Sequence, residues 1–324
     1  MNHRFQNILT CIISIAVAAL ILGVMIVRVW DELLIAVADV QYRYLIGSIG
    51  LCLSSWLMRG YRYQKILNNL MIPVGLFFST ACIFLSQTIN IVVPARLGDL
   101  VRVIPIHHEH KGTISQGLSS IIVERLFDIV TIALLGLFAV AFVIDAPAWL
   151  ASVIVISLFV AGMGVTFILV SKEWRTKNRY LGFVLNMFDE IRMAALSRQA
   201  MILLLIISTI IWIFDIMICY FIALMFHVTI PFNLVFLAII IGNLVKAIPI
   251  TPGGIGTYEL ALAATFELGK VPAATATIVS VVDHFIKNLI TLIGGMASIL
   301  YFGTWIIPRI TDIVNEKLFK NVEK

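Results

Sequence analysis

The chain alternates long apolar runs with short polar connections. The runs lie at about residues 8–27, 44–58, 70–93, 129–144, 148–170, 200–226, 232–250 and 273–303. A helix needs ~20 apolar residues to cross the hydrocarbon core of a bilayer, and several of these runs reach that length. The pattern predicts an all-α polytopic membrane protein, with one integral domain over residues 1–324.

Composition strengthens this prediction. Of the 324 residues, 61% are hydrophobic and 13% are charged, about half the charged share of an ordinary soluble domain. The net charge of +5 falls mostly beside the apolar runs, which suits anionic inner-leaflet lipids and argues against a nucleic-acid partner. Single cysteines without C-x-x-C spacing favour packing over a disulfide or zinc site; they are Cys11, Cys52, Cys82 and Cys219. We expect no metal and no cofactor.

One apolar run is broken at Pro249–Glu259, which reads P-I-T-P-G-G-I-G-T-Y-E. Inside a bilayer, a broken helix leaves backbone groups unpaired, which is tolerated only where protein or a water-filled cavity supplies partners. Lys246 and Glu259 flank this break at membrane depth. The break therefore predicts a site for a polar or charged group; its candidate residues include Thr251, Gly253, Gly254 and Gly256.

A similar break lies in the first half of the chain. Asn90 precedes Pro94 and an A-R-L-G-D segment that contains Arg96 and Asp99, just as Asn243 precedes the second break. Paired interruptions at corresponding places are typical of inverted-repeat transporters with a site near the midplane. We therefore expect half 1 at about residues 1–145, half 2 at about 146–303 and a cytoplasmic tail at 304–324.

Charged residues follow both breaks. Each would cost about 2.5 to 3.5 kcal/mol at the bilayer centre on insertion scales, so we expect them to turn inward. Residues four apart share a helix face. Two interpretations remain open, internal ion pairs that hold the bundle together or a polar path for a headgroup. The residues are Glu124, Arg125 and Asp128 after the first break and Asp283, His284 and Lys287 after the second.

Basic residues predict the topology, because short cytoplasmic loops collect Lys and Arg. Arg59, Arg62 and Lys65 indicate one inside loop and residues 172–198 another, yet three apolar runs separate them. Two loops on the same side of the membrane must be separated by an even number of crossings. One of the three runs is therefore expected to enter the membrane and return to the same face. The same reasoning in the second half predicts about six full crossings and two re-entrant hairpins that enter from opposite faces, with both termini cytoplasmic. A tilted full crossing remains an alternative for residues 70–93.

Three motifs together resemble a known family. They are P-A-R-L-G-D (Pro94–Asp99), E-R-L-F-D (Glu124–Asp128) and the Pro249–Glu259 break. In this order and spacing they resemble the flippase-like transmembrane family typified by the membrane half of lysylphosphatidylglycerol synthase. The resemblance covers nearly the whole chain. It implies a lipid flippase for aminoacylated phospholipids or glycolipids, and it places all three motifs at the polar pathway.

Two departures from the family pattern change the expectation. The synthases continue into a soluble aminoacyl-transfer domain, whereas this chain ends about 20 residues after its last apolar run, so we expect that it does not itself charge a lipid. Many relatives have an arginine where this chain has V-V-D-H at 281–284. A histidine there is only partly charged near neutral pH, which leaves the headgroup open.

Two functions therefore remain. The first is a transporter that moves a phospholipid or lipid-linked glycan between leaflets of a prokaryotic plasma membrane. The second is a membrane-embedded transferase, with Glu124 or Asp128 as general base, or an accessory subunit. Possible partners are a separate lipid-modifying synthase or glycosyltransferase and a second copy of the chain.

Smaller features have local interpretations. The H-H-E-H stretch at 107–110 is expected to be a solvated loop and not a metal site, because it lacks the i,i+4 histidines of H-E-x-x-H. Asp215 is either an ion-coupling acid or hydrogen-bonded to a neighbour. Residues 172–198 alternate basic and apolar side chains, which suits an interfacial helix on an anionic leaflet.

Overall fold

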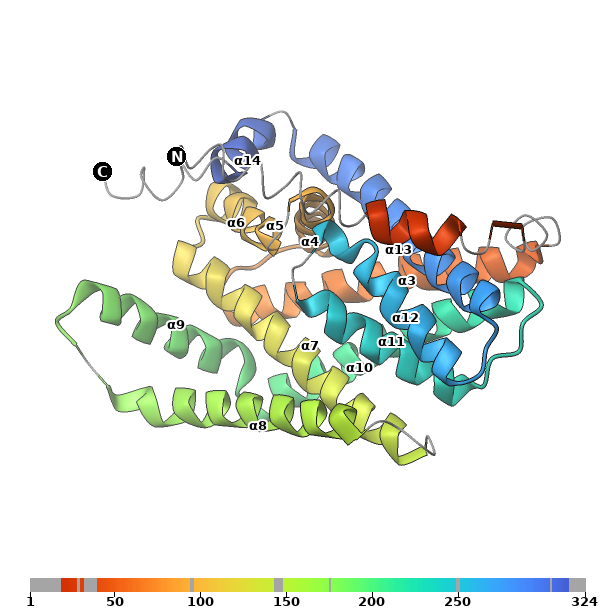
Figure 1. The fold of residues 1–324 in the computed structure, drawn as a ribbon. Helices are drawn as coiled ribbons and strands as arrows, with labels where there is room; N and C mark the ends of the chain where they lie inside the picture. Colours follow the sequence, from red (N-terminus) through yellow and green to blue (C-terminus); the bar gives the residue numbers. More distant parts are fainter. Residues whose placement is uncertain are drawn as a thin grey trace, which may run out of the picture.

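A computed structural model describes residues 19–27, 30–31, 40–93, 96–142, 148–174, 176–248, 251–303 and 305–314. All regular structure within these ranges is helical (Figure 1). Two of the described helices, α10 (Arg198–Met225) and α13 (Ala273–Phe302), are long and apolar enough to cross a bilayer. These two helices, and the wholly helical regular structure of the described residues, agree with the all-α membrane protein that the apolar pattern predicts.

Helices α3 (Tyr42–Asn69) and α10 form an antiparallel pair at the centre of the bundle. The backbone of Gln41, before α3, donates to the carbonyl of Met225, at the end of α10 (3.0 Å). Each helix has 28 residues and is about 42 Å long at the usual rise. This pair is the frame against which the two broken segments pack.

The first broken segment folds back on itself. Helix α4 (Leu76–Val92) leads to the break, and the chain returns as α5 (Gly98–Val101) and α6 (Val103–His110). The His110 ring, at the end of α6, lies 4.5 Å from the ring of Phe78, at the start of α4. The segment therefore begins and ends at the same end of the bundle.

The second broken segment is also a hairpin. Helix α11 (Phe232–Ala247) and helix α12 (Thr257–Leu268) lie side by side, with a 3₁₀ turn η3 (Pro252–Gly254) between them. Gly242 packs against Leu262, and Gly269 packs against Leu234, so the two helices are antiparallel. The 16 residues of α11 rise about 24 Å, which is less than the ~30 Å hydrocarbon core.

The tips of the two hairpins meet inside the bundle. A Cβ on Gly253 would lie 3.2 Å from the Cα of Ile91, and the guanidinium of Arg96 donates to the carbonyl of Lys246 (3.1 Å). Phe78, at the open end of the first hairpin, contacts Phe302 at the end of α13, whereas the second hairpin leads into the start of α13 at Ala273. The tips therefore touch while the open ends of the two hairpins lie at opposite ends of the bundle. Helix α7 (Ile114–Phe142) and α13 pack beside them.

Helices α8 and α9 form one edge of the bundle (Figure 1). Helix α8 (Ala148–Val170) exposes large apolar side chains such as Phe159 and Met163, which suits contact with lipid tails. Helix α9 (Arg179–Ala195) buries Leu185 and Ile191 and exposes apolar side chains such as Tyr180 and Met193 together with the charged Asp189. The amphipathic helix expected in this part of the chain is confirmed, and its contact with an anionic leaflet stays a prediction.

A short amphipathic helix, α14 (Ile306–Val314), packs against α5, α6 and α13. Some features named in the sequence lie outside the described residues. These are Cys11, Pro94, Pro249, the start of the first apolar run and the tail beyond residue 314. The other three cysteines, Cys52, Cys82 and Cys219, are buried and free.

Two local expectations were wrong. Arg59 and Arg62 do not lie in a loop, because α3 continues to Asn69; Arg62 is buried against carboxylates of α7. Lys65 also lies within α3, so none of the three residues marks a loop. The H-H-E-H stretch is the last turn of α6 and not a loop, although its four side chains are exposed.

Candidate functional site

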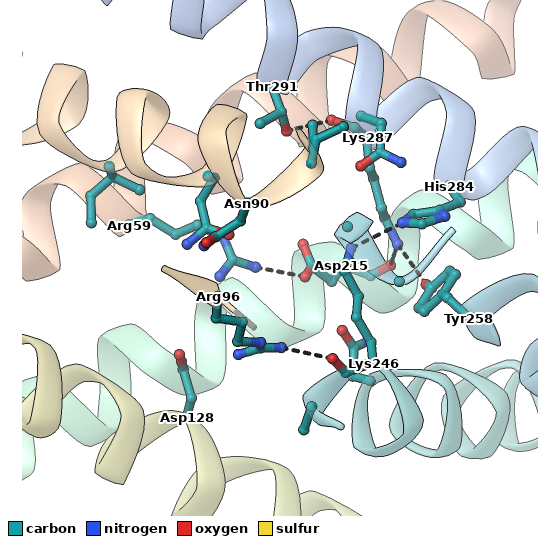
Figure 2. Close-up of a pocket in the computed structure, with 18 of the residues that line it drawn as sticks. Arg59, Asn90, Arg96, Asp128, Asp215, Lys246, Tyr258, His284, Lys287 and Thr291 are labelled. Atoms are coloured by element: carbon teal, nitrogen blue, oxygen red, sulfur yellow. Dashed lines mark hydrogen bonds and ion pairs between the residues drawn. The ribbon is translucent and has the colours of Figure 1, made fainter. Parts of the chain in front are cut away.

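A cavity of about 400 Å³ lies where the hairpin tips meet α3, α7, α10 and α13 (Figure 2). Its volume is within the range of small-ligand sites. Of the predicted site residues, those that line it are Arg96, Glu124, Arg125, Asp128, Asn243, Lys246, Thr251, Gly253, Gly254, His284 and Lys287. The remaining ones, Asp99, Gly256, Glu259 and Asp283, are buried behind this wall and hold its side chains in place.

The second hairpin tip depends on glycine. Gly253, Gly254 and Gly256 have φ angles of 62°, 77° and 84°, which residues with a Cβ rarely adopt. A Cβ on Gly254 would also lie 2.7 Å from Cγ of Lys246. Glycine is therefore needed here both for the backbone turn and for the passage of the lysine side chain.

A chain of three side chains links the cavity to a buried acid. Nζ of Lys246 lies 3.0 Å from Nε2 of His284, and Nδ1 of His284 lies 2.8 Å from Oε1 of Glu259. A carboxylate can only accept, so Nδ1 donates to Glu259 and Nε2 accepts from the lysine. The second carboxylate oxygen of Glu259 accepts from the backbone N–H of Gly256 (2.8 Å), which caps α12.

A second lysine on the cavity wall, Lys287, has its positive charge balanced by an acid. Nζ of Lys287 lies 2.9 Å from the carboxylate of Asp283, one turn earlier on α13. The hydroxyl of Tyr258 donates to the same carboxylate (2.8 Å). This group fixes Lys287 on the cavity wall beside Tyr258 (Figure 2).

The wall also contains an ion pair that the sequence analysis missed, and its acid, Asp215, lies beside Lys287, whose Nζ is 3.3 Å from the Asp215 carbonyl oxygen. Arg59 of α3 donates to Asp215 of α10 (2.6 Å), and Ser55 donates to the same acid (3.1 Å). Asp215 is thus paired and lines the cavity. The sequence did contain a signal for this pair. Ser55 and Arg59 are four residues apart and Arg59 and Arg62 are three apart, so all three share one face of an apolar helix.

A buried ionic network supports the first hairpin. Arg62 donates to Asp128 (2.7 Å) and Glu124 (3.1 Å), and the other oxygen of Glu124 accepts from Arg102. Arg125 lies 3.4 Å from both Asp99 and Asp128. Internal ion pairing therefore accounts for Glu124. Sequence analysis missed the two fully buried arginines, Arg62 and Arg102.

The two halves repeat one arrangement. In each, the acid after the break pairs with a basic residue of the following long helix, Asp99 with Arg125 (3.4 Å) and Glu259 with His284 (2.8 Å). The flanking motifs also correspond, E-R-x-x-D at 124–128 and D-H-x-x-K at 283–287. Histidine in the second half thus occupies the place of arginine in the first.

Metal binding has no candidate in the part of the chain that the structure describes. No group of three or more His, Cys, Asp or Glu side chains there has the geometry to hold an ion.

The chain is similar to a known family and to individual known proteins. A family model described as the lysylphosphatidylglycerol synthase TM region matches residues 11–295. The glycosyltransferase AglD of Haloferax volcanii is 31% identical over 83% of this chain and 49% of its own length, so the chain spans about half of that relative. A UPF0104 membrane protein of Methanocaldococcus jannaschii is 28% identical over 64% of this chain and 91% of its own length. A UPF0104 membrane protein of Methanothermobacter thermautotrophicus is 24% identical over 74% of this chain and 80% of its own length.

Proposed function

The chain belongs to the family of the lysylphosphatidylglycerol synthase transmembrane region, and on that premise we propose that it moves the polar headgroup of a lipid between the two leaflets of a membrane. The observation that supports this most is the cavity between the tips of two hairpins that enter from opposite ends of the bundle. Each tip reaches only part of the way across, so the cavity lies at the depth where a headgroup has to pass.

We propose the topology that goes with this function. The hairpins 76–110 and 232–268 are re-entrant, one from each face of the membrane. The six full crossings are the first apolar run, α3, α7, α8, α10 and α13. This order makes the two halves an inverted repeat, which agrees with the repeated pairing of acid and base after each break. Both termini are then cytoplasmic, in the plasma membrane of a prokaryote.

The wall chemistry supports a headgroup path. A charged group at the bilayer centre costs about 2.5 to 3.5 kcal/mol on insertion scales, and charged side chains already fixed in place would reduce that cost for a headgroup. The cavity wall offers ionic groups from both halves of the chain, including Arg59 with Asp215 and Lys287 with Asp283. The lipid tails would remain outside, against apolar faces such as that of α8.

The second candidate is an enzyme, or an accessory subunit, that acts on a lipid-linked substrate. The similarity to the glycosyltransferase AglD favours it. A general base must reach the proton that it removes, and both oxygens of Glu124 already accept from arginines. Asp128 also lines the cavity, but its two oxygens likewise accept from arginines, Arg62 and Arg125, so both acids are already engaged.

A leaflet-transfer assay tests the proposal. Purified full-length protein is reconstituted in liposomes with fluorescent phospholipids, and a membrane-impermeant quencher reports how much lipid reaches the outer leaflet. We expect transfer well above that of protein-free liposomes. If folded protein gives no more transfer than protein-free liposomes, the transporter proposal is overturned. Release of labelled sugar from a sugar nucleotide onto lipid in the same liposomes would then favour the enzyme.

A further inference from the structure

Two cations face the cavity without an acidic partner, one from each hairpin tip. The guanidinium of Arg96 donates to the carbonyl of Lys246 (3.1 Å). The ammonium of Lys246 donates to a histidine nitrogen (3.0 Å). Among the described residues, neither cation has a carboxylate oxygen within 4.0 Å, the limit for an ion pair.

The other cations of the cavity wall are paired with acids, so the unpaired positive charge is confined to the hairpin tips. Arg59 pairs with Asp215 at 2.6 Å, and Lys287 pairs with Asp283 at 2.9 Å. Arg125 is shared among carboxylates of the buried network. Acids close to the cavity are thus engaged elsewhere, and the positive charge at the meeting point of the two hairpins has no acidic partner within the described protein.

The backbone brings these two cations together. Arg96 has a φ of 55°, a left-handed conformation that a non-glycine residue rarely adopts outside turns and functional sites. Gly254 leaves room for the stem of Lys246. Because the guanidinium of Arg96 is bonded to the backbone carbonyl of Lys246, it lies at the base of the lysine side chain, and Figure 2 shows both side chains at the cavity.

We propose that Arg96 and Lys246 form a site for the phosphate group of an anionic lipid headgroup. This inference rests on the proposed function and names its substrate class. An arginine presents a planar fork of donors to phosphate oxygens, and a lysine adds a point charge. The same surplus repels a cationic headgroup, such as an aminoacylated one. The preferred cargo is therefore a lipid whose net charge is negative.

Binding to the purified full-length protein in a non-ionic detergent tests the site. The probes are dihexanoyl phosphatidic acid, dihexanoylglycerol, which lacks only the phosphate, and inorganic phosphate. We expect the phosphatidic acid to bind and dihexanoylglycerol not to bind. Arg96→Gln and Lys246→Met should each weaken that binding at least tenfold, while Lys246→Arg should retain most of it. Inorganic phosphate that binds as tightly as the phosphatidic acid would overturn the lipid assignment.

Lys270→Met is the matched control, since Lys270 is an exposed cation that does not line the cavity. We expect it to bind like the wild type; an equal loss in this variant would mean that anions bind only to the general positive surface. Thermal unfolding of each variant confirms that it is folded. If Arg96→Gln fails to fold, the two lysine variants still test the phosphate site, because Lys246→Met removes the positive charge and Lys246→Arg keeps it.

Transport separates this inference from the proposed function. In liposomes we expect wild-type protein to move an anionic fluorescent lipid faster than a cationic one, and Lys246→Met to lose that preference. If wild-type protein moves lipids but both tip variants keep the full anionic preference, the phosphate site is wrong and the transporter stands. If binding depends on both cations but no lipid is moved, the site stands and the transporter is wrong.

Discussion

Nδ1 of His284 lies 2.8 Å from Oε1 of Glu259, and this contact ties the second hairpin tip to α13. The contact repeats that of Arg125 with Asp99 in the first half, where the two residues are 3.4 Å apart. The first half uses a permanent cation, whereas the second uses a side chain that also accepts a hydrogen bond from Lys246. A neutral histidine can donate to Glu259 and accept from Lys246 at once, whereas an arginine at this position has no acceptor for the lysine.

Replacing Glu259 tests that link. Glu259→Gln removes the charge that His284 faces and weakens the cap on Gly256. An unsatisfied buried polar group costs about 1 to 3 kcal/mol, so we expect a loss of stability in that range. Unfolding of the purified protein measures it. His284→Arg retains the pair but leaves Lys246 against a cation, so it should impair transport more than stability.

Arg62 tests the buried ionic network. Removing one partner from a buried charged set costs about 3 to 5 kcal/mol, because the remaining charges stay desolvated. Arg62→Met should therefore reduce the yield of folded protein strongly, since Glu124 and Asp128 both lose a donor. Lys65→Met, one turn later on α3, is the control and should leave the yield near that of the wild type. Equal yields for the two variants would mean that the network contributes little.

The sequence allowed the breaks to be predicted because proline and glycine interrupt an apolar run visibly. The hairpins were inferred from counting basic residues, and that count rested in part on Arg59 and Arg62, which are inside α3. The return of each segment is nevertheless confirmed by contacts such as Phe78 with His110. That the two segments are re-entrant in a membrane stays a prediction.

Partners far apart in the chain could not be predicted in this way. An arginine near the end of an apolar helix either reaches the interface or turns inward, and its own sequence neighbours do not decide between the two. Arg62 turns inward because it forms an ion pair with Glu124, which lies on another helix. The Arg59 pair with Asp215 likewise depends on the packing of α3 against α10, which no local pattern reveals.

Cysteine labelling tests the opposite entry of the hairpins. Glu109 and Glu267 are exposed, near the ends of the first and second hairpins, so a cysteine at either position is accessible without disturbing the core. In a background without native cysteines, we expect Glu109→Cys to react with an impermeant reagent from the cytoplasm and Glu267→Cys to react from outside. Both residues labelled from the same face would contradict the inverted arrangement.

The glycine at the second tip gives the sharpest test of the mechanism. Gly254→Val forces a Cβ into a left-handed position and against the stem of Lys246; such strain costs about 1 to 3 kcal/mol. The displaced lysine would no longer reach the cavity, so we expect lipid transfer to fall by at least tenfold at equal amounts of folded protein. Gly162→Val is the matched control, because a Cβ at Gly162 on α8 would meet nothing within 4 Å. If both variants transfer lipid at the wild-type rate, the tip has no part in transport; if both lose it equally, the effect is one of added bulk and not of the Lys246 position.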